Sequence, residues 1–167
     1  MSAPPELAVD LHLFDPRLTG WGFPHWGSAG AAGLDLHACL DAPLTLDPRA
    51  PAVLIPAGFA LAIRDPSWCG LIYPRSGLGH RDGLVLGNGV GVIDADYTGP
   101  LMISAWNRNP AGPALTIAPG DRIAQLVFTR ITRPRFTLVD GPAEAGSGRG
   151  AGGFGSTGVA AGRTQTP

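Results

Sequence analysis

Four short segments of the sequence combine residue types that could hold a phosphorylated ligand and activate a water molecule. The first is Pro74–Leu78, where Arg75 and Ser76 precede Gly77. An arginine and a hydroxyl can hold phosphate oxygens, and a glycine lets the backbone come close to them. Taken alone, this segment could equally be an ordinary surface turn.

The second segment, Leu86–Gly99, alternates glycines with β-forming residues, which predicts a β-hairpin with a tight bend. Such a hairpin could admit a flat base, and Asn88 offers both a donor and an acceptor. Asp94 follows an apolar pair, so we expect it to be partly desolvated at a strand end, as suits a general base. Asp94 could also cap a turn. Asp96 should face the other side of the strand.

The third segment, Pro119–Phe128, is a Pro-Gly turn that leads into a strand with alternating faces. Gln125 is expected on one face with Ile123 and Val127, where a polar group needs a partner or a ligand. Arg122 is expected to pair locally and to be structural.

The fourth segment, Arg149–Gly158, is glycine-rich. Its glycines, followed by Ser156 and Thr157, could form a nest of backbone amides around a phosphate. Phe154 could stack on a nucleobase, which is worth roughly 1–3 kcal/mol per base. Taken alone, this segment favours a flexible tail with incidental residues.

Apolar stretches bounded by turn residues must form the elements that position these segments. The 25 glycines and 17 prolines alternate with these stretches, which predicts many short strands and at most one short helix. Strands are expected over 9–14, 33–40, 52–63, 68–73, 84–93, 101–106, 123–129 and 136–139. This spacing predicts an all-β sandwich or jelly roll.

The composition changes at Gly141, which divides the chain into a β domain over 1–140 and a glycine-rich arm over 141–167. The arm has too little apolar content to offset the entropy cost of ordering it, so by itself it should be mobile.

Overall composition excludes several classes of protein. The chain has no lysine, and a P-loop needs one to reach the phosphates. The net charge of −1 gives no basic field for nucleic acid. The apolar run Ala50–Ile63 is too short to span a bilayer, and residues 1–16 lack the basic start of a signal peptide. Cys39 and Cys69 should be reduced thiols in or near the core. We therefore expect a soluble cytoplasmic protein.

Together with Ala32–Leu36, these four segments in this order resemble the five motifs of the trimeric dUTPase family. The similarity runs from about Leu11 to Gly158. It implies a jelly-roll fold, a homotrimer with active sites shared between chains, and hydrolysis of dUTP to dUMP and pyrophosphate. We assign no role to the Gly- and Trp-rich stretch 20–31.

The resemblance also implies roles for individual residues. Phosphate contacts would come from Arg75, Ser76, Gly77 and, near the α-phosphate, Gln125. The uracil and deoxyribose pocket would be formed by Asn88, Tyr97 and the backbone of Val92, Ile93 and Met102. The arm would close over the nucleotide with Arg149, Phe154, Ser156 and Thr157.

Asp94 would then touch the 3′-hydroxyl and hold the water that attacks the α-phosphate. Asp35 would act on the Mg²⁺ side through water molecules, and the substrate phosphates would supply the direct ligands of the metal.

Two alternatives remain open at this point. A dCTP deaminase shares the fold but needs a glutamate at the base, and this chain has only Glu6 and Glu144. A catalytically idle jelly roll could bind dUTP or a protein partner, although it would not need to keep Asp94, Arg75 and Phe154.

Overall fold

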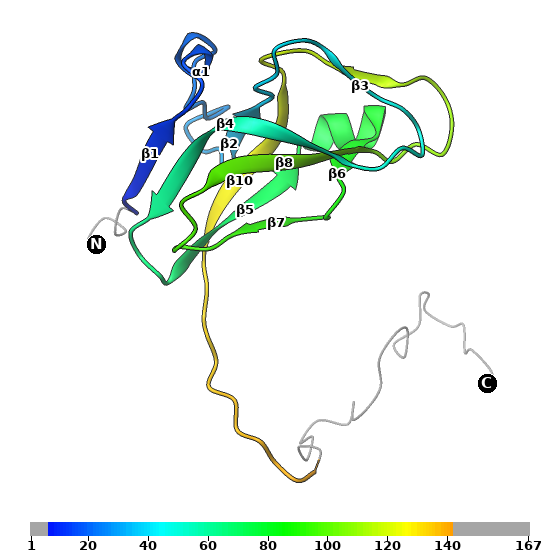
Figure 1. The fold of residues 1–167 in the computed structure, drawn as a ribbon. Coiled ribbons are helices and arrows are strands. Elements are labelled where there is room, and N and C mark those ends of the chain that lie inside the picture. The colour runs from blue at the N-terminus through cyan, green and yellow to red at the C-terminus, as the bar shows by residue number, and fades with distance from the viewer. Residues whose placement is uncertain (1–6, 142–167) are drawn as a thin grey trace, which may run out of the picture. The chain divides into compact units, whose positions relative to one another are not determined.

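The computed structural model describes residues 7–141, and its contacts divide the chain between Thr132 and Arg133. The part before this division is built mainly of strands (Figure 1). In chain order its elements are β1 Val9–Leu13, α1 Arg17–Gly20, β2 Leu34–His37, β3 Leu44–Leu46, β4 Val53–Ile63, β5 Trp68–Pro74, η1 Leu78–Asp82, β6 Leu84–Leu86, β7 Gly91–Ile93, β8 Pro100–Asn107, β9 Leu115–Ile117 and β10 Arg122–Arg130.

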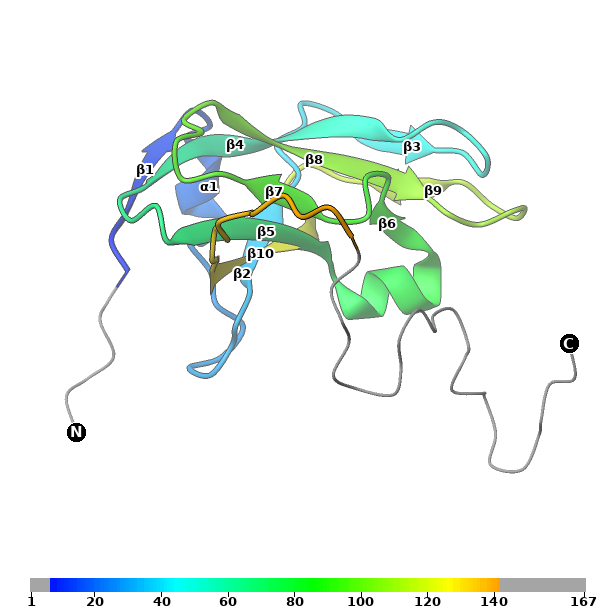
Figure 2. The same ribbon diagram turned by 90° about the horizontal axis from the view of Figure 1, so that it is seen from below.

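The strands form two four-stranded antiparallel sheets and a two-stranded one. One sheet has the order β1-β4-β8-β6 and the other the order β2-β10-β5-β7, while β3 pairs with β9. Figure 2 shows the two larger sheets as separate layers, with β4 and β8 in one and β5 and β10 in the other. The predicted all-β jelly-roll class is confirmed.

Alternation along the strands builds the core between these layers. In β8, Leu101, Ile103 and Ala105 are buried while Met102 and Trp106 are exposed, as the two-residue period of a strand requires. The largest fully buried apolar side chains come from α1 and from strands of all three sheets: Leu18, Leu36, Ile55, Phe59, Leu101, Ile103, Ile117 and Leu126. Each contributes about 1.5–3 kcal/mol of transfer free energy.

The predicted strand over 84–93 is wrong in one respect. It is two strands, β6 and β7, separated by a turn over 87–90. They do not pair with each other: β6 pairs with β8 in one sheet, and β7 pairs with β5 in the other. The segment therefore crosses between the layers, and the predicted β-hairpin is not formed.

Other local predictions also differ from the structure. Residues 136–139 contain no strand, and the described residues include two short helical segments, α1 and η1, where at most one was expected. The short strands β3 and β9 were not predicted. Cys39 and Cys69 are free thiols, and Cys69 is buried, as expected. Within residues 7–141, no helix has the length and apolar character needed to cross a membrane.

Candidate active site

A cleft of about 400 Å³ lies where β2, β10 and the end of β5 meet; we call it the Asp35 cleft. Asp35 comes from β2 and Gln125 from β10, and these two residues are register partners. Arg75 and Ser76 follow β5 directly. The complete lining is Gly27, Ala31, Ala32, Gly33, Asp35, Arg75, Ser76, Gln125 and Val127. The structure therefore brings together four of the predicted site residues, while Gly77 lies one residue beyond the lining.

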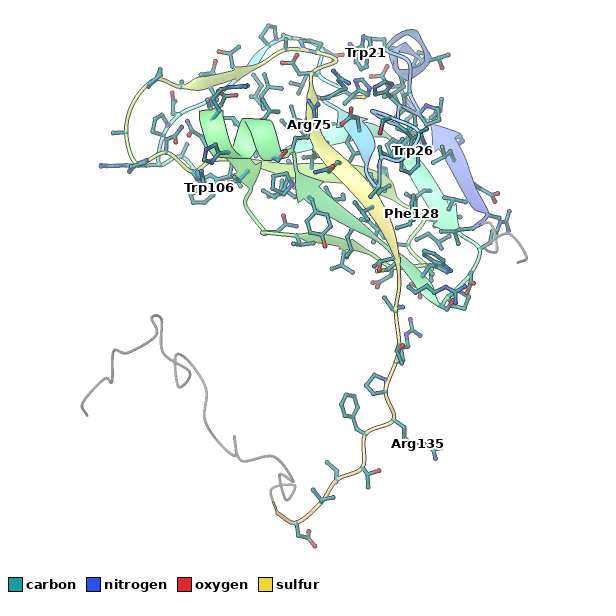
Figure 3. All side chains as sticks on the ribbon, turned by 180° about the vertical axis from the view of Figure 1, so that it is seen from behind. Trp21, Trp26, Arg75, Trp106, Phe128 and Arg135 are labelled. Carbon is teal, nitrogen blue, oxygen red and sulfur yellow. The ribbon has the colours of Figure 1, made fainter. Side chains whose placement is uncertain are left out.

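Asp35 pairs with two arginines. Its side chain is only 11% exposed, with Oδ1 3.2 Å from Arg75 Nε and Oδ2 3.1 Å from Arg122 Nη1. Arg75 also donates from Nη1 to the Arg122 carbonyl at 3.0 Å. Figure 3 shows Arg75 beside β10, the strand that begins at Arg122. The predicted local pairing of Arg122 is wrong, because its partner lies 87 residues away in the sequence.

Gln125 is fixed at the wall of this cleft. Its Nε2 donates to the Pro74 carbonyl at 3.1 Å, and a Cβ added at Gly33 would lie 2.4 Å from its Oε1. A side chain at position 33 would therefore push the Gln125 amide out of this place. Ile123 does not share the face of Gln125 as predicted: it is buried in the core, because a bulge between Arg122 and Ala124 interrupts the alternation.

Two residues of the stretch 20–31 line the Asp35 cleft. These residues, Gly27 and Ala31, with the adjoining Ala32, form one wall. Their small side chains leave room beside Arg75, but small residues carry no chemical signal by which the sequence could have revealed this role. The same stretch also contains Trp26, which lies beside Phe128 in a separate apolar pocket (Figure 3).

A second cleft, of about 180 Å³, lies between the end of β7 and the start of β8; we call it the Asp94 cleft. It is lined by Val92, Ile93, Asp94, Tyr97, Pro100, Leu101 and Met102. Five of these residues were predicted from the resemblance. Asn88 lies in the exposed turn after β6 and is not part of the lining.

Asp94 stands directly after β7, at a strand end as predicted. Its side chain is exposed in this chain, so the predicted partial desolvation is wrong for the chain alone. Its carbonyl accepts the Tyr97 N–H at 3.1 Å, whereas no side-chain or backbone donor of residues 7–141 reaches its carboxylate. The carboxylate is therefore free to accept a hydrogen bond from a ligand or a water.

The two clefts share no lining residue and lie well apart. Ile93 pairs with Gly70, so Asp94 lies at the level of Cys69, whereas Arg75 follows the far end of β5. At about 3.3 Å per residue, Asp94 and Arg75 are roughly 20 Å apart along the sheet. The two groups of predicted site residues therefore lie in separate clefts of one chain.

No group of three or more His, Cys, Asp or Glu side chains that could hold a metal occurs within residues 7–141. The arm residues Arg149, Phe154, Ser156 and Thr157 lie outside the described part of the chain.

Comparison with known proteins adds a family to this geometry. The dUTPase family model matches residues 19–158, which include both clefts. The chain belongs to the dUTPase family.

Curated relatives and solved structures agree with this family. A protein of Xanthomonas euvesicatoria pv. vesicatoria named deoxyuridine 5'-triphosphate nucleotidohydrolase is 53% identical over 158 residues, covering 94% of this chain and 99% of that protein. One of the same name from Xylella fastidiosa is 55% identical, covering 90% and 95%. The dUTPase of Staphylococcus bacteriophage 80alpha, solved with dUpNHpp, superposes with a TM-score of 0.76 at 26% identity, covering 91% of this chain and 99% of that one.

Proposed function

We propose that this chain hydrolyses dUTP to dUMP and pyrophosphate. The observation that carries the proposal is its membership of the dUTPase family, with relatives above 50% identity over nearly the whole chain that are named for this activity. The two clefts support it, because one offers a free carboxylate beside Ile93, Tyr97 and Met102 and the other offers arginine, hydroxyl and amide donors.

In this proposal Asp94 is the general base. It orients a water in line with the α-phosphorus, accepts the proton of that water, and contacts the 3′-hydroxyl of the sugar. Its exposed position at the end of β7, with no partner among residues 7–141, leaves its lone pairs available for both contacts. Precise placement of the water can lower the barrier by several kcal/mol.

The Asp94 cleft would take the nucleoside. Backbone groups of Val92, Ile93 and Met102, with Asn88 from the preceding turn, would bond the edge of uracil and so disfavour cytosine. Tyr97 would pack under the deoxyribose and leave no room for a 2′-hydroxyl. Mismatched hydrogen bonds discriminate between ligands more strongly than the ~1–3 kcal/mol of a methyl-sized misfit.

The Asp35 cleft would take the phosphates. Arg75, Ser76 and Gly77 would bind the phosphate chain, and Gln125 would approach the α-phosphate. Arginine suits this task because its planar fork can donate two parallel hydrogen bonds to phosphate oxygens.

Mg²⁺ fits this cleft as a partner of the substrate. Asp35 is the only carboxylate in the lining, and its two oxygens are already paired with Arg75 and Arg122, so it suits contact through a metal-bound water. The substrate phosphates would be the direct ligands. When bound, the metal would neutralise negative charge on the phosphate chain. Residues of the protein would hold the substrate phosphates in place.

We also propose a homotrimer whose sites are shared between chains. The distance between Asp94 and Arg75 within one chain exceeds the few bonds that separate an α-phosphorus from the terminal phosphate. A site that uses both clefts therefore needs the Asp94 cleft of one chain and the Asp35 cleft of another, and ring-forming contacts of this kind suit a closed trimer. In this assembly the arm over 141–167 of a chain, carrying Arg149, Phe154, Ser156 and Thr157, would cover a site beside the β domain over 1–140. We propose that the protein acts on free nucleotides in the cytoplasm.

The decisive experiment measures pyrophosphate release from dUTP, dCTP, dTTP and UTP, each with and without Mg²⁺. The proposal expects rapid release from dUTP with Mg²⁺ and little from the other three nucleotides. Ammonia release from dCTP would favour a deaminase, and dUTP binding without turnover would favour an idle binding protein.

Asp94→Asn tests the role of the base. We expect dUTP affinity within about tenfold of the parent chain and loss of most turnover, because the amide binds but cannot accept the proton. Asp96→Asn is the matched control, since Asp96 is an exposed neighbour outside the cleft. Full turnover in the Asp94 variant, measured in single-turnover and steady-state assays, would remove Asp94 from this role.

A further inference from the structure

The pairing of one carboxylate with two arginines in the Asp35 cleft is more than a structural ion pair. Asp35 accepts a hydrogen bond from Arg122 at 3.1 Å and forms an ion pair with Arg75 Nε at 3.2 Å, and all three side chains come from different strands or strand ends. Two cations and one anion leave this cluster with one net positive charge. This net positive charge would attract a ligand that carries several negative charges.

Arg122 is held firmly where it meets Asp35. The turn before it is tied to β2, because His37 Nδ1 donates to the Gly120 carbonyl at 2.8 Å and Ala38 N–H donates to the Asp121 carbonyl at 2.8 Å. The Trp21 ring covers Gly120 so closely that an added Cβ would lie 2.9 Å from it. The first residue of β10 therefore has little freedom to move relative to Asp35.

Arg75 is oriented from two sides. Its Nε faces Asp35, and one Nη1 hydrogen is donated to the Arg122 carbonyl. A guanidinium has five N–H donors, so three remain for a ligand. Arg75 lines the cleft and is 34% exposed, whereas Arg122 is absent from the lining.

We propose that Arg122 is a positioning residue for the phosphate-binding arginine. It neutralises Asp35 and, through its carbonyl, orients Arg75, so that the positive charge of Arg75 is available to the phosphate chain. Without Arg122, Asp35 would pair with Arg75 alone, and the cluster would lose its net charge. This inference rests on the proposed function, because it takes a polyphosphate as the ligand of the cleft.

The experiment is a double-mutant cycle read by calorimetric binding of inorganic pyrophosphate to the full-length protein without Mg²⁺. In the parent background, Arg122→Gln should weaken pyrophosphate binding about tenfold, equivalent to about 1.4 kcal/mol. In an Asp35→Asn background there is no carboxylate to neutralise, so the same substitution should change the affinity less than about twofold. An equal loss in both backgrounds would overturn the proposal.

A conservative substitution separates charge from shape. Arg122→Lys keeps the cation and should bind pyrophosphate within about threefold of the parent chain. A loss as large as that of Arg122→Gln would overturn the charge argument even if the glutamine variant folds poorly. Arg64→Gln is the matched control, because it breaks an exposed Arg64–Asp10 pair outside the cleft and should leave pyrophosphate affinity unchanged.

Steady-state kinetics distinguish this inference from the proposed function. If the parent chain hydrolyses dUTP, Arg122→Gln should raise KM about tenfold while kcat changes less than about threefold, since Asp94 is untouched. A parent chain without dUTP turnover would refute the proposed function. An active parent whose glutamine variant binds pyrophosphate normally would refute only the role of Arg122.

Discussion

Tyr97 shows how single residues shape the Asp94 cleft. Its hydroxyl donates to the Pro100 carbonyl at 2.9 Å, so the polar end of the ring is fixed to the start of β8. The ring lies over Gly99, where an added Cβ would come within 2.6 Å of the Tyr97 oxygen. The position of the ring is therefore set by a hydrogen bond and by the absence of a side chain next to it.

We predict that Gly99→Ala relaxes the choice between dUTP and UTP. The new methyl group must push the half-exposed Tyr97 ring aside, which is cheap for folding but opens space beside the sugar. The ratio of kcat/KM for dUTP over UTP should fall about tenfold, while the melting temperature changes little. Gly20→Ala, where no heavy atom lies within 4 Å, is the control. An unchanged ratio would show that Tyr97 does not set the sugar preference.

At the scale of elements, the short helix α1 depends on the residue before it. Asp15 accepts from the Arg17 backbone N–H at 2.9 Å and from the Arg17 side chain, and this contact lowers the pKa of Asp15 to about 2. The same carboxylate faces Cys39, whose pKa burial raises to about 12, so that thiol stays protonated at neutral pH. The Asp15 carboxylate thus connects α1 to Cys39, which follows β2.

We predict that Asp15 makes stability depend on acid pH. Because the pKa of Asp15 in the folded chain lies below its ordinary value of 3.8, the stabilisation is complete above about pH 4 and is lost as the pH falls through about 2. The parent chain should therefore lose more melting temperature between pH 4 and 2 than Asp15→Asn does. Asp41→Asn removes a fully exposed partner of the same arginine and should retain the slope of the parent. Identical slopes for the parent and Asp15→Asn would contradict the prediction.

The sequence predicted the long elements well because their signal is local. Apolar stretches bounded by turn residues located β1, β2, β4, β5, β8 and β10, and they indicated the all-β class. They could not show that β6 and β7 join different sheets, since pairing depends on partners elsewhere in the chain. The strands β3 and β9 have three residues each, too few for a visible period.

The candidate site was also predictable only in part, where its residues are close together in the sequence. Glycine, arginine and aspartate motifs indicated both clefts, because each motif is continuous in sequence. The pairing of Asp35 with Arg122 spans 87 residues, and a bulge at the start of β10 sets its geometry, so no local pattern reveals it. The exposure of Asp94 was likewise invisible, because an apolar pair before it suggested burial.

At the scale of the whole molecule, the two clefts of one chain are the halves of different proposed sites. We predict that two inactive variants, Asp94→Asn and Arg149→Ala, restore activity when refolded together. If the arm and the Asp94 cleft of a site come from different chains, an equal mixture should regain about a quarter of the parent sites by random assembly.

The control for this mixture is each variant refolded with itself, which should remain inactive. Size-exclusion chromatography with light scattering should give the mass of three chains for the parent and for both variants. A mixture that stays inactive although trimers form would show that Asp94 and Arg149 of a working site come from the same chain.

The distance between the two clefts has a consequence for the cell that makes this protein. In the proposed assembly, a newly synthesised chain would carry both kinds of half-site and could complete neither of them by itself. The first copies would therefore be silent, and catalysis would begin only when copies meet. Total activity would then increase more steeply than the concentration of the protein. A modest change in expression could therefore switch the activity on or off.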